Sequence, residues 1–552
     1  MSIPVEADPA LNPDPHMLVI APPGCGKTEL LARRADYLIP RLGPHQQILA
    51  LTFSNRARQN LTDRLIRAVG AQQFRRRVHV RNFHGYAAEI IRAHGQTIGI
   101  DPKFPMPTRN TLTCAVARYT VDMTREQAAD ARKGIESALR EAKSDAHDDD
   151  AVGRELDRIG NPFAREIERD RAAAGLFHYD DLLRHAQRLL GIEAVGALYR
   201  AHFGAILVDE FQDLSPQQLR IALGSCTESI TCVGDPLQGI YSWAGARPVE
   251  IEAELRVVCG PPHRLTMSYR SSPAVLGVVN KVAVLAGGET LVAAHPENWI
   301  GGGAAVAHVF DTEDEESQWI VDISTKILDS DPTATIGVIT REGWRRAVTD
   351  EKFGHASHLP RQRWDLAIDD EEVLQLLHTV AAQHPKAEGD NLRKFVLSAV
   401  EPSDVETHDR VATALDTFLE QAELFGSPAS ALSQLRPPEM SGSLQPGVHL
   451  LNAHTGKGRQ FDWVFVPGIE EFHIPSGQSK PEDLAEELRV LLVMLSRARH
   501  GLVVTAARSR ISKKGNPYPT TPSRWWWAVA QSCSLNAATM LEHLDRLTTG
   551  RP

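Results

Sequence analysis

Short apolar runs alternate with amphipathic stretches through the first 260 residues of the chain. The runs at 17–20, 48–53 and 205–208 are too short for helices, and each leads into a polar turn. Helical periodicity follows at 29–39 and 60–69. This order predicts repeated βα units and therefore a mainly parallel sheet.

The same alternation returns in the second half of the chain. Apolar runs at 304–310 and 335–340 predict strands, and a further sheet segment is expected from Val448 to about Trp527. Helical patterns without strands interrupt both halves, at 97–176 and at 346–446. We therefore predict an α/β protein with two lobes, each built on a parallel sheet and each interrupted by a mainly helical insertion.

These patterns also place the expected boundaries of the lobes and insertions. The predicted order is first lobe 1–96, helical insertion 97–176, first lobe again 177–258, second lobe 259–345, reduced helical insertion 346–446, second lobe again 447–531 and C-terminal tail 532–552.

The stretch that follows the first apolar run is typical of a phosphate-binding loop. A strand, a glycine-rich turn and a helix in this order can cradle phosphate oxygens with backbone N–H groups. Lys27 can reach the β- and γ-phosphates, and the Thr28 hydroxyl can bind Mg²⁺. An ordinary glycine turn before a helix is the alternative. The predicted nucleotide-binding residues here are Ala21, Pro22, Pro23, Gly24, Cys25, Gly26, Lys27 and Thr28.

A second stretch ends an apolar strand with two adjacent carboxylates, Asp209 and Glu210. In a nucleotide hydrolase, Asp209 would bind Mg²⁺ and Glu210 would orient and deprotonate the attacking water. A solvated acidic strand end is the alternative when this stretch is taken alone. The phosphate loop about 180 residues upstream favours the catalytic interpretation, because several parts then agree.

A glutamine and two aromatic residues follow the next predicted strand. Gln238 could sense the γ-phosphate, and Tyr241 and Trp243 could stack on nucleobases. Core packing is the alternative for either ring. The basic run Arg75–Arg77 could contact a nucleic-acid backbone, although a solvated loop is favoured there.

Composition narrows the class of protein. The 552 residues carry a net charge of −10, which argues against a polyanion-binding surface over the whole molecule but allows a local basic groove. The six cysteines form no CxxC pair, which indicates a reduced, cytoplasmic protein. The acidic start at 1–16 lacks an apolar signal core, and no run of about 18 apolar residues predicts a membrane span.

Taken together, the motifs make the chain resemble the UvrD/Rep-type superfamily 1 DNA helicases. Besides the two nucleotide stretches, the family pattern is matched in order across residues 17–527. The further matching stretches are Leu51–Ala57, Asn82–Gly85, Tyr179–Leu183, Gly234–Ala246, Ser268–Ser272, Asn452–Phe461, Glu487–Arg489 and Met494–Arg499.

This resemblance implies two RecA-like P-loop NTPase lobes that use ATP and Mg²⁺. It places Glu210 and Gln238 of the first lobe with Arg270 and Arg497 of the second as the catalytic groups, and Gln460 beside the nucleotide. It also implies a track for single-stranded or partly duplex DNA. The residues along that track would be Phe53, Asn55, Phe83, His84, Tyr241, Trp243 and His454. Taken singly, without the order of the motifs, the phenylalanines and histidines would rather be interpreted as buried packing residues.

The chain departs from the family pattern at several positions. The family's glutamine before the phosphate loop, which reads adenine, is missing from 11–16, so nucleobase selection is expected to be loose. Gln460 stands where the family usually has Glu, and Ala244 where an Arg that touches DNA often sits. Coupling between nucleotide and DNA is therefore expected to differ from the family's usual form.

The sequence thus predicts an ATP-dependent DNA helicase or translocase, 3′→5′ by resemblance, in repair, recombination or phage defence. The reduced insertion keeps open a DNA-stimulated ATPase subunit that regulates a partner nuclease, as in Gabija-like defence pairs. A non-catalytic DNA-binding scaffold and a small-molecule P-loop kinase are further alternatives. The catalytic residues argue against the scaffold, and the aromatic track argues against the kinase.

Overall fold

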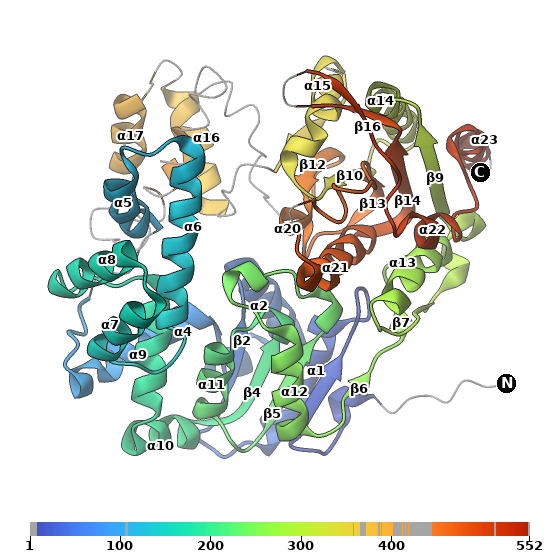
Figure 1. Ribbon diagram of the computed structural model, residues 1–552. Coiled ribbons are helices and arrows are strands. Elements are labelled where there is room, and N and C mark those ends of the chain that lie inside the picture. The colour runs from blue at the N-terminus through green and yellow to red at the C-terminus, as the bar shows by residue number, and fades with distance from the viewer. Residues whose placement is uncertain are drawn as a thin grey trace. The chain divides into compact units, whose positions relative to one another are not determined.

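The computed structural model describes most of the chain between residues 8 and 549. Within that range it leaves out 105–106, 108, 357, 365–370, 385–386, 388, 401–410, 412–413, 416–417, 420–443, 478 and 513–514. The chain divides into two compact units (Figure 1). The first comprises Met1–Pro22 and Gly26–Leu265, and the second comprises Pro23–Cys25 and Thr266–Pro552. Each unit is built around its own sheet.

The first unit holds a six-stranded sheet with the order β3-β2-β4-β5-β1-β6. Every neighbouring pair in it is parallel. Its strands are β1 (His16–Ile20), β2 (Gln47–Thr52), β3 (Val78–Asn82), β4 (Phe203–Asp209), β5 (Ile230–Gly234) and β6 (His263–Arg264). The side chains of the four inner strands, β1, β2, β4 and β5, are almost all buried, as expected for parallel strands covered on both faces.

Helices cover both faces of this sheet. Alternate strand residues such as Leu18 and Ile206 share one apolar core with α4, α9, α11 and α12. Helix α1 packs against α2 and contacts β4 and β5. The helices of this sheet are α1 (Lys27–Leu38), α2 (Asn55–Val69), α3 (Ala71–Arg77), α4 (Phe83–His94), α9 (Tyr179–Leu190), α10 (Glu193–His202), α11 (Pro216–Ser225) and α12 (Pro248–Cys259).

A separate group of helices forms the insertion between α4 and α9 (Figure 1). It has its own apolar core, which includes Val116, Ile135, Leu156 and Ile167. The helices are α5 (Arg109–Thr120), α6 (Arg125–Ala142), α7 (Asp149–Ile159) and α8 (Pro162–Ala173). These bounds fall inside the helical insertion predicted at 97–176.

The second unit holds another six-stranded, all-parallel sheet, with the order β11-β12-β10-β13-β14-β9. Its strands are β9 (Ala304–Phe310), β10 (Thr335–Thr340), β11 (Arg361–Arg363), β12 (Gly447–Asn452), β13 (Phe461–Val466) and β14 (Ala498–Ala507). Two small sheets join β7 (Met267–Ser268) to β8 (Val292–Ala293) and β15 (Ser509–Ile511) to β16 (Pro517–Pro519).

The helices of the second unit follow its strands. Helices α16 and α17 contribute to a small apolar core of their own, with Val373, Leu392 and Phe418 among its members. The helices are α13 (Pro273–Leu285), α14 (Glu313–Ser330), α15 (Ala347–His355), α16 (Glu371–Gln383), α17 (Gly389–Ser398), α20 (Ala453–Gly456), α21 (Leu484–Leu495), α22 (Trp526–Ala530) and α23 (Ala537–Thr549).

The predicted fold class, two parallel-sheet lobes with helical insertions, is confirmed. The strands predicted at 304–310 and 335–340 have those bounds in the structure. The basic run Arg75–Arg77 was favoured as a solvated loop, but it ends helix α3, and Arg77 donates to the carbonyls of Gly43 and Pro44. Among the described residues, no helix is both long enough and apolar enough to cross a membrane.

Candidate nucleotide and nucleic-acid sites

The predicted phosphate loop leads from β1 into α1. The Ala21 amide donates to the Gly234 carbonyl at the end of β5, which fixes the start of the loop. Gly24 and Gly26 have φ values of +83° and +82°, a left-handed conformation that favours glycine. Gly26 is the N-cap of α1 and makes no side-chain cap bond. The first N–H groups of α1 can therefore donate to a bound anion.

Lys27 lies near the end of β4, where the adjacent carboxylates Asp209 and Glu210 follow one another. The Lys27 ammonium donates to the Ala21 carbonyl at 3.0 Å and lies 3.7 Å from the Glu210 carboxylate. Glu210 has a φ of +55°, which is uncommon outside glycine and directs the chain away from the sheet. The structure thus brings Lys27 and Glu210, 183 positions apart in sequence, to one edge of the first sheet.

Asp209 has the chemistry of a cation ligand. Its side chain is only 4% exposed, and its Oδ1 atom has no hydrogen-bond partner in the described structure. Burial and the neighbouring charge of Glu210 raise the pKa of Asp209 to about 7. A divalent cation would supply the missing partner, and Mg²⁺ prefers such oxygen ligands. The residues therefore fit Mg²⁺, which Asp209 and Thr28 would hold.

A polar network continues from this edge. Gln212 donates to the Glu210 carboxylate at 2.7 Å and accepts the Asp235 amide at 2.9 Å. Gln238 donates to Asp235 at 2.9 Å. The network links Gln238 to Glu210 through two residues that the sequence analysis did not select, Gln212 and Asp235. Their place directly after β4 and β5 was the signal that could have identified them.

In the second unit, the two predicted arginines meet at one residue. Arg270 donates to the Ser496 carbonyl at 3.4 Å, and Arg497 donates to the Ser496 hydroxyl at 2.9 Å. Arg497 is buried and also donates to the Val493 carbonyl of α21. Ser496 is the C-cap of α21, whose partial negative charge favours cations. The structure thus places Arg270 and Arg497, 227 positions apart in sequence, beside one another.

The predicted aromatic residues of the first unit form two groups. The Phe53 and Tyr241 rings stack at 5.3 Å, and the Tyr241 and Trp243 rings meet edge to face at 6.1 Å. The Trp243 side chain is 63% exposed. His84 meets Tyr179, an exposed ring not selected from the sequence, at 5.5 Å. Exposed rings in series are the arrangement on which nucleobases stack.

Phe83 does not belong to this aromatic series. It is fully buried in the core of the first unit, so its predicted contact with DNA is wrong and the packing alternative holds. Burial lowers the pKa of neighbouring His84, which favours the neutral imidazole. Asn55 begins α2, but its side chain lies outside the described residues.

The remaining predicted residues of the second unit lie after β12. His454 is in α20, whose N-cap Asn452 accepts the Thr455 amide. Gln460 is exposed. Arg459, which precedes it, is buried against the Trp364 ring at 3.6 Å. Gln460 is therefore held at the surface by a buried neighbour.

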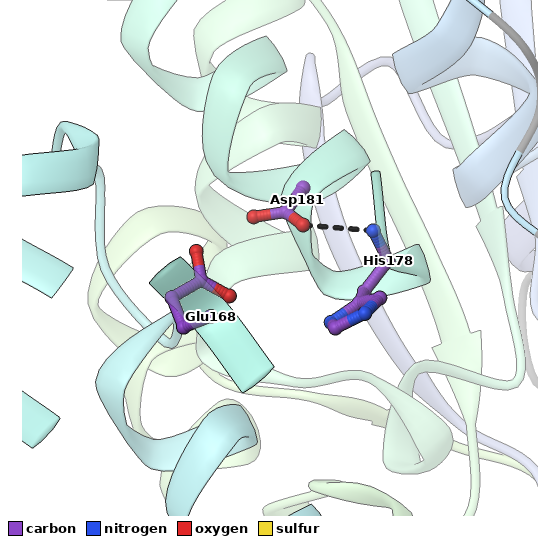
Figure 2. Close-up of side chains that lie close together, drawn as sticks. All are labelled: Glu168, His178 and Asp181. Carbon is purple, nitrogen blue, oxygen red and sulfur yellow. Dashed lines mark hydrogen bonds between the residues drawn. The ribbon is translucent and has the colours of Figure 1, made fainter. Parts of the chain in front are cut away.

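One further cluster, in the first unit, has the donor set of a metal site. The ligand atoms of Glu168, His178 and Asp181 lie within 4.8 Å of one another (Figure 2). The Lys143 ammonium, however, lies 2.6 Å from Glu168 Oε2, 2.8 Å from Asp181 Oδ2 and 3.4 Å from His178 Nδ1. Burial and Lys143 lower the pKa of His178 to about 3, so its neutral ring can accept from Lys143. The ammonium thus takes the position that a metal ion would need.

Comparison with known proteins agrees with this arrangement. The UvrD/REP helicase N-terminal domain family matches residues 5–256, and the UvrD-like helicase C-terminal domain family matches residues 369–509. The chain is 25% identical to ATP-dependent DNA helicase UvrD2 of Mycobacterium tuberculosis, over 95% of this chain and 81% of the relative. It is 24% identical to DNA helicase II of Escherichia coli, over 94% and 86%. With both halves matched in order over two parallel-sheet units, the chain belongs to the UvrD/REP helicase family.

Proposed function

We propose that this chain hydrolyses ATP to move along single-stranded DNA. The observation that carries the proposal is the cluster at the edge of the first sheet. There the uncapped N-terminus of α1 and the Lys27 ammonium lie close to the end of β4, which carries Glu210 and the unpartnered oxygen of Asp209. An anion receptor beside a cation ligand is the chemistry that a magnesium nucleotide requires.

In this mechanism the chain's own residues perform distinct tasks. Lys27 and the N–H groups of α1 bind phosphate oxygens, and Glu210 accepts a proton from the attacking water. Gln212 holds the Glu210 carboxylate in place by a hydrogen bond, and Gln238 does the same for the Asp235 carboxylate. When bound at Thr28 and Asp209, Mg²⁺ would neutralise charge on the phosphates. By family resemblance, Arg270 and Arg497 are proposed to stabilise charge on the γ-phosphate.

The DNA is proposed to contact a series of aromatic rings in the first unit, which includes the exposed ring of Trp243. Phe53, Tyr241 and Trp243 lie in series and follow β2 and β5, so the DNA contacts and the catalytic residues share one sheet. Single-strand stacking tolerates any sequence and typically contributes about 1–3 kcal/mol per base. His84 and His454 would extend the contact. By family resemblance, movement is proposed to be 3′→5′, in repair, recombination or defence against phage.

The test is steady-state ATP hydrolysis with and without single-stranded DNA. The wild-type protein is expected to hydrolyse ATP faster when DNA is present, and Lys27→Ala is expected to abolish both rates because the ammonium no longer binds the phosphates. Hydrolysis by Lys27→Ala at the wild-type rate would refute the assignment of the nucleotide site. Wild-type hydrolysis that DNA does not change would refute the coupling to DNA.

A second candidate function is supported by the size of the insertion in the second unit. The insertion expected at 346–446 has about a hundred residues, whereas this insertion is usually larger in the family. Among its described residues, α16 and α17 contribute to a small apolar core. The chain would then act as a DNA-stimulated ATPase that regulates a partner such as a nuclease. This version predicts DNA-stimulated hydrolysis with little strand separation by the chain alone, measured by release of a labelled strand from a tailed duplex.

A further inference from the structure

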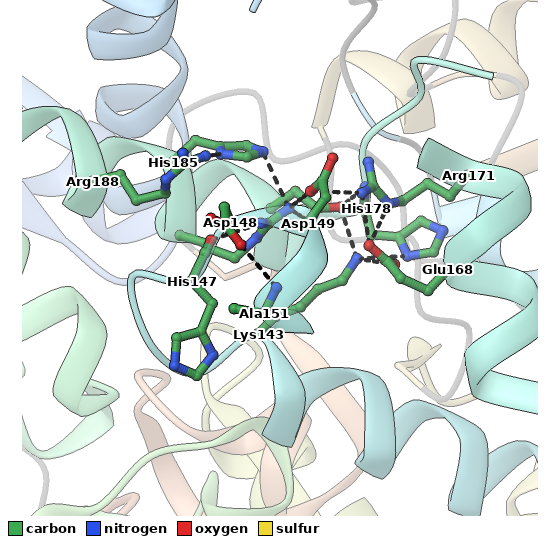
Figure 3. Close-up of polar contacts among 12 residues, drawn as sticks. Lys143, His147, Asp148, Asp149, Ala151, Glu168, Arg171, His178, His185 and Arg188 are labelled. Atoms are coloured by element: carbon green, nitrogen blue, oxygen red, sulfur yellow. Dashed lines mark hydrogen bonds and ion pairs between the residues drawn. The ribbon is translucent and has the colours of Figure 1, made fainter. Parts of the chain in front are cut away.

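The last turn of helix α6 is fixed by a buried network of charges (Figure 3). Lys143, the C-cap of α6, is fully buried and pairs with Glu168 of α8 and Asp181 of α9. Burial alone would raise the pKa of Asp181, but Lys143, Arg171 and Arg184 hold it well below its usual range. The buried carboxylate therefore stays charged, and its ion pairs bind the insertion helices to α9.

The last turn of α6 is also bonded to α11, the helix that follows strand β4. Gln217 of α11 donates to the Lys143 carbonyl at 3.2 Å, and both side chains are buried. Helix α11 begins at Pro216, three residues after the 3₁₀ turn Phe211–Asp213 that follows Glu210. The end of α6 therefore has a fixed position relative to the sheet of the first unit.

Arg140 lies one turn before Lys143 and reaches the backbone of the turn that carries Trp243. Its guanidinium donates to the Trp243 carbonyl, and its Cδ atom lies 3.4 Å from where a Cβ on Gly245 would be. Gly245 has a φ of +94°, so the chain turns tightly beneath the arginine. A side chain of the helical insertion thus holds the turn that presents Trp243.

Arg140 differs from other arginines of the insertion in its partners. Arg132, Arg158 and Arg165 each form an ion pair with a carboxylate of α6 or α7. Arg140 forms none within the described ranges of the chain. The turn 241–246 contains no cation of its own, and Arg140 brings a positive charge to its backbone. A guanidinium held on the same turn as an exposed indole can bind a phosphate while the base of that nucleotide stacks on the ring.

We propose that Arg140 binds a backbone phosphate of the nucleotide whose base stacks on Trp243. One N–H group holds the Trp243 carbonyl, and the remaining donors of the planar guanidinium face the phosphate in a fork. The Lys143 network holds the arginine in register with the ring. This inference rests on the proposed binding of single-stranded DNA, and it adds a residue from the helical insertion to that site.

The test measures how binding depends on salt. The affinity of a fluorescent oligothymidylate is measured by anisotropy at several salt concentrations for the wild type and Arg140→Ala. The loss of one phosphate contact is expected to weaken binding roughly tenfold and to reduce the slope of log K against log salt by about 0.7. Arg158→Ala, which removes an exposed and ion-paired arginine of the same insertion, is the matched control and is expected to change neither quantity.

Two further variants separate phosphate binding from a purely structural role. Arg140→Lys keeps the charge and is expected to retain the salt slope. Arg140→Gln can still donate to the Trp243 carbonyl and is expected to lose the slope as Arg140→Ala does. Melting temperatures establish that each variant is folded.

The possible outcomes are distinguishable. Weaker binding by Arg140→Ala with an unchanged salt slope would overturn the proposal, because Arg140 would then only hold the turn. Binding equal to that of the wild type would also overturn it, while leaving the proposed function intact. A wild-type protein that fails to bind the oligonucleotide would overturn both.

Discussion

The two sheets of this protein have the same parallel design, but the helices that follow their first strands begin in opposite ways. Strand β1 leads to α1, whose N-cap Gly26 makes no side-chain bond. Strand β9 leads to α14, whose N-cap Thr312 accepts the Glu315 amide. The first turn of α14 also carries Glu313 and Glu316. The N-terminus of α1 can therefore bind an anion, whereas the N-terminus of α14 is capped and carries negative charge.

The charge at the closed helix start is neutralised inside the protein. Arg510 pairs with Glu313 at 2.9 Å and with Glu316 at 2.7 Å, and it also pairs with Glu470. Burial would lower the pKa of Arg510, but these carboxylates raise it well above its usual value. The second unit thus uses its charges for internal structure at this position and offers its arginines elsewhere, beside Ser496. Two sheets of the same design can therefore differ in function, because function depends on the residues around the strand ends.

The largest expected effect comes from the arginines of the second unit. Arg497→Lys keeps the charge but loses the planar fork, so we expect DNA-stimulated ATP turnover to fall by about 10³-fold or more. The measurement is steady-state hydrolysis at saturating DNA. Arg499→Lys is the matched control, because Arg499 is more exposed and pairs with Asp462. Full turnover by Arg497→Lys would remove Arg497 from the reaction.

Glu210, the proposed general base, is expected to have the next largest effect. Glu210→Gln keeps the shape of the side chain but cannot accept a proton, so turnover should fall by about 10²- to 10⁴-fold. Binding of ATP should persist, because Lys27 and the N–H groups of α1 are unchanged. Single-turnover hydrolysis and binding of a fluorescent nucleotide measure the two steps separately. Undiminished turnover would contradict the assigned role of Glu210.

Some of the features behind these predictions could be predicted from the sequence, and others could not. Strands such as 304–310 could be predicted with their bounds because consecutive apolar residues between polar turns are a local signal. The burial of Phe83 could not, since an aromatic residue at a helix start suits either a core or a surface. The contact of Arg140 with Trp243 joins residues 103 positions apart, and no local pattern encodes it.

Substitution of the stacked aromatic residues of the first unit should have a smaller effect than substitution of the proposed catalytic residues. Trp243→Ala removes an exposed ring, and the loss of about 1–3 kcal/mol of stacking corresponds to an affinity about 5- to 150-fold weaker for single-stranded DNA. The melting temperature should change little, because the side chain contributes little to the core. A large loss of stability with unchanged affinity per folded molecule would instead indicate a packing role for Trp243.

The smallest expected effect concerns pH and the cation. Burial and Glu210 raise the pKa of Asp209 to about 7, so below pH 7 a proton competes with Mg²⁺ for this carboxylate. We expect the apparent affinity for Mg²⁺, measured through nucleotide binding at pH 6, 7 and 8, to fall about tenfold per pH unit below 7 and to level off above it.

Because the folded pKa of Asp209 lies above the unfolded value of 3.8, charging Asp209 costs stability as pH rises towards 7. In buffer without Mg²⁺ at pH 8, Asp209→Asn should therefore melt at a higher temperature than the wild type, and Mg²⁺ should raise the melting temperature of the wild type only. An affinity for Mg²⁺ that is the same at pH 6 and pH 8 would show that Asp209 does not bind the cation. The proposed difference between the starts of α1 and α14 would then depend only on phosphate binding at α1.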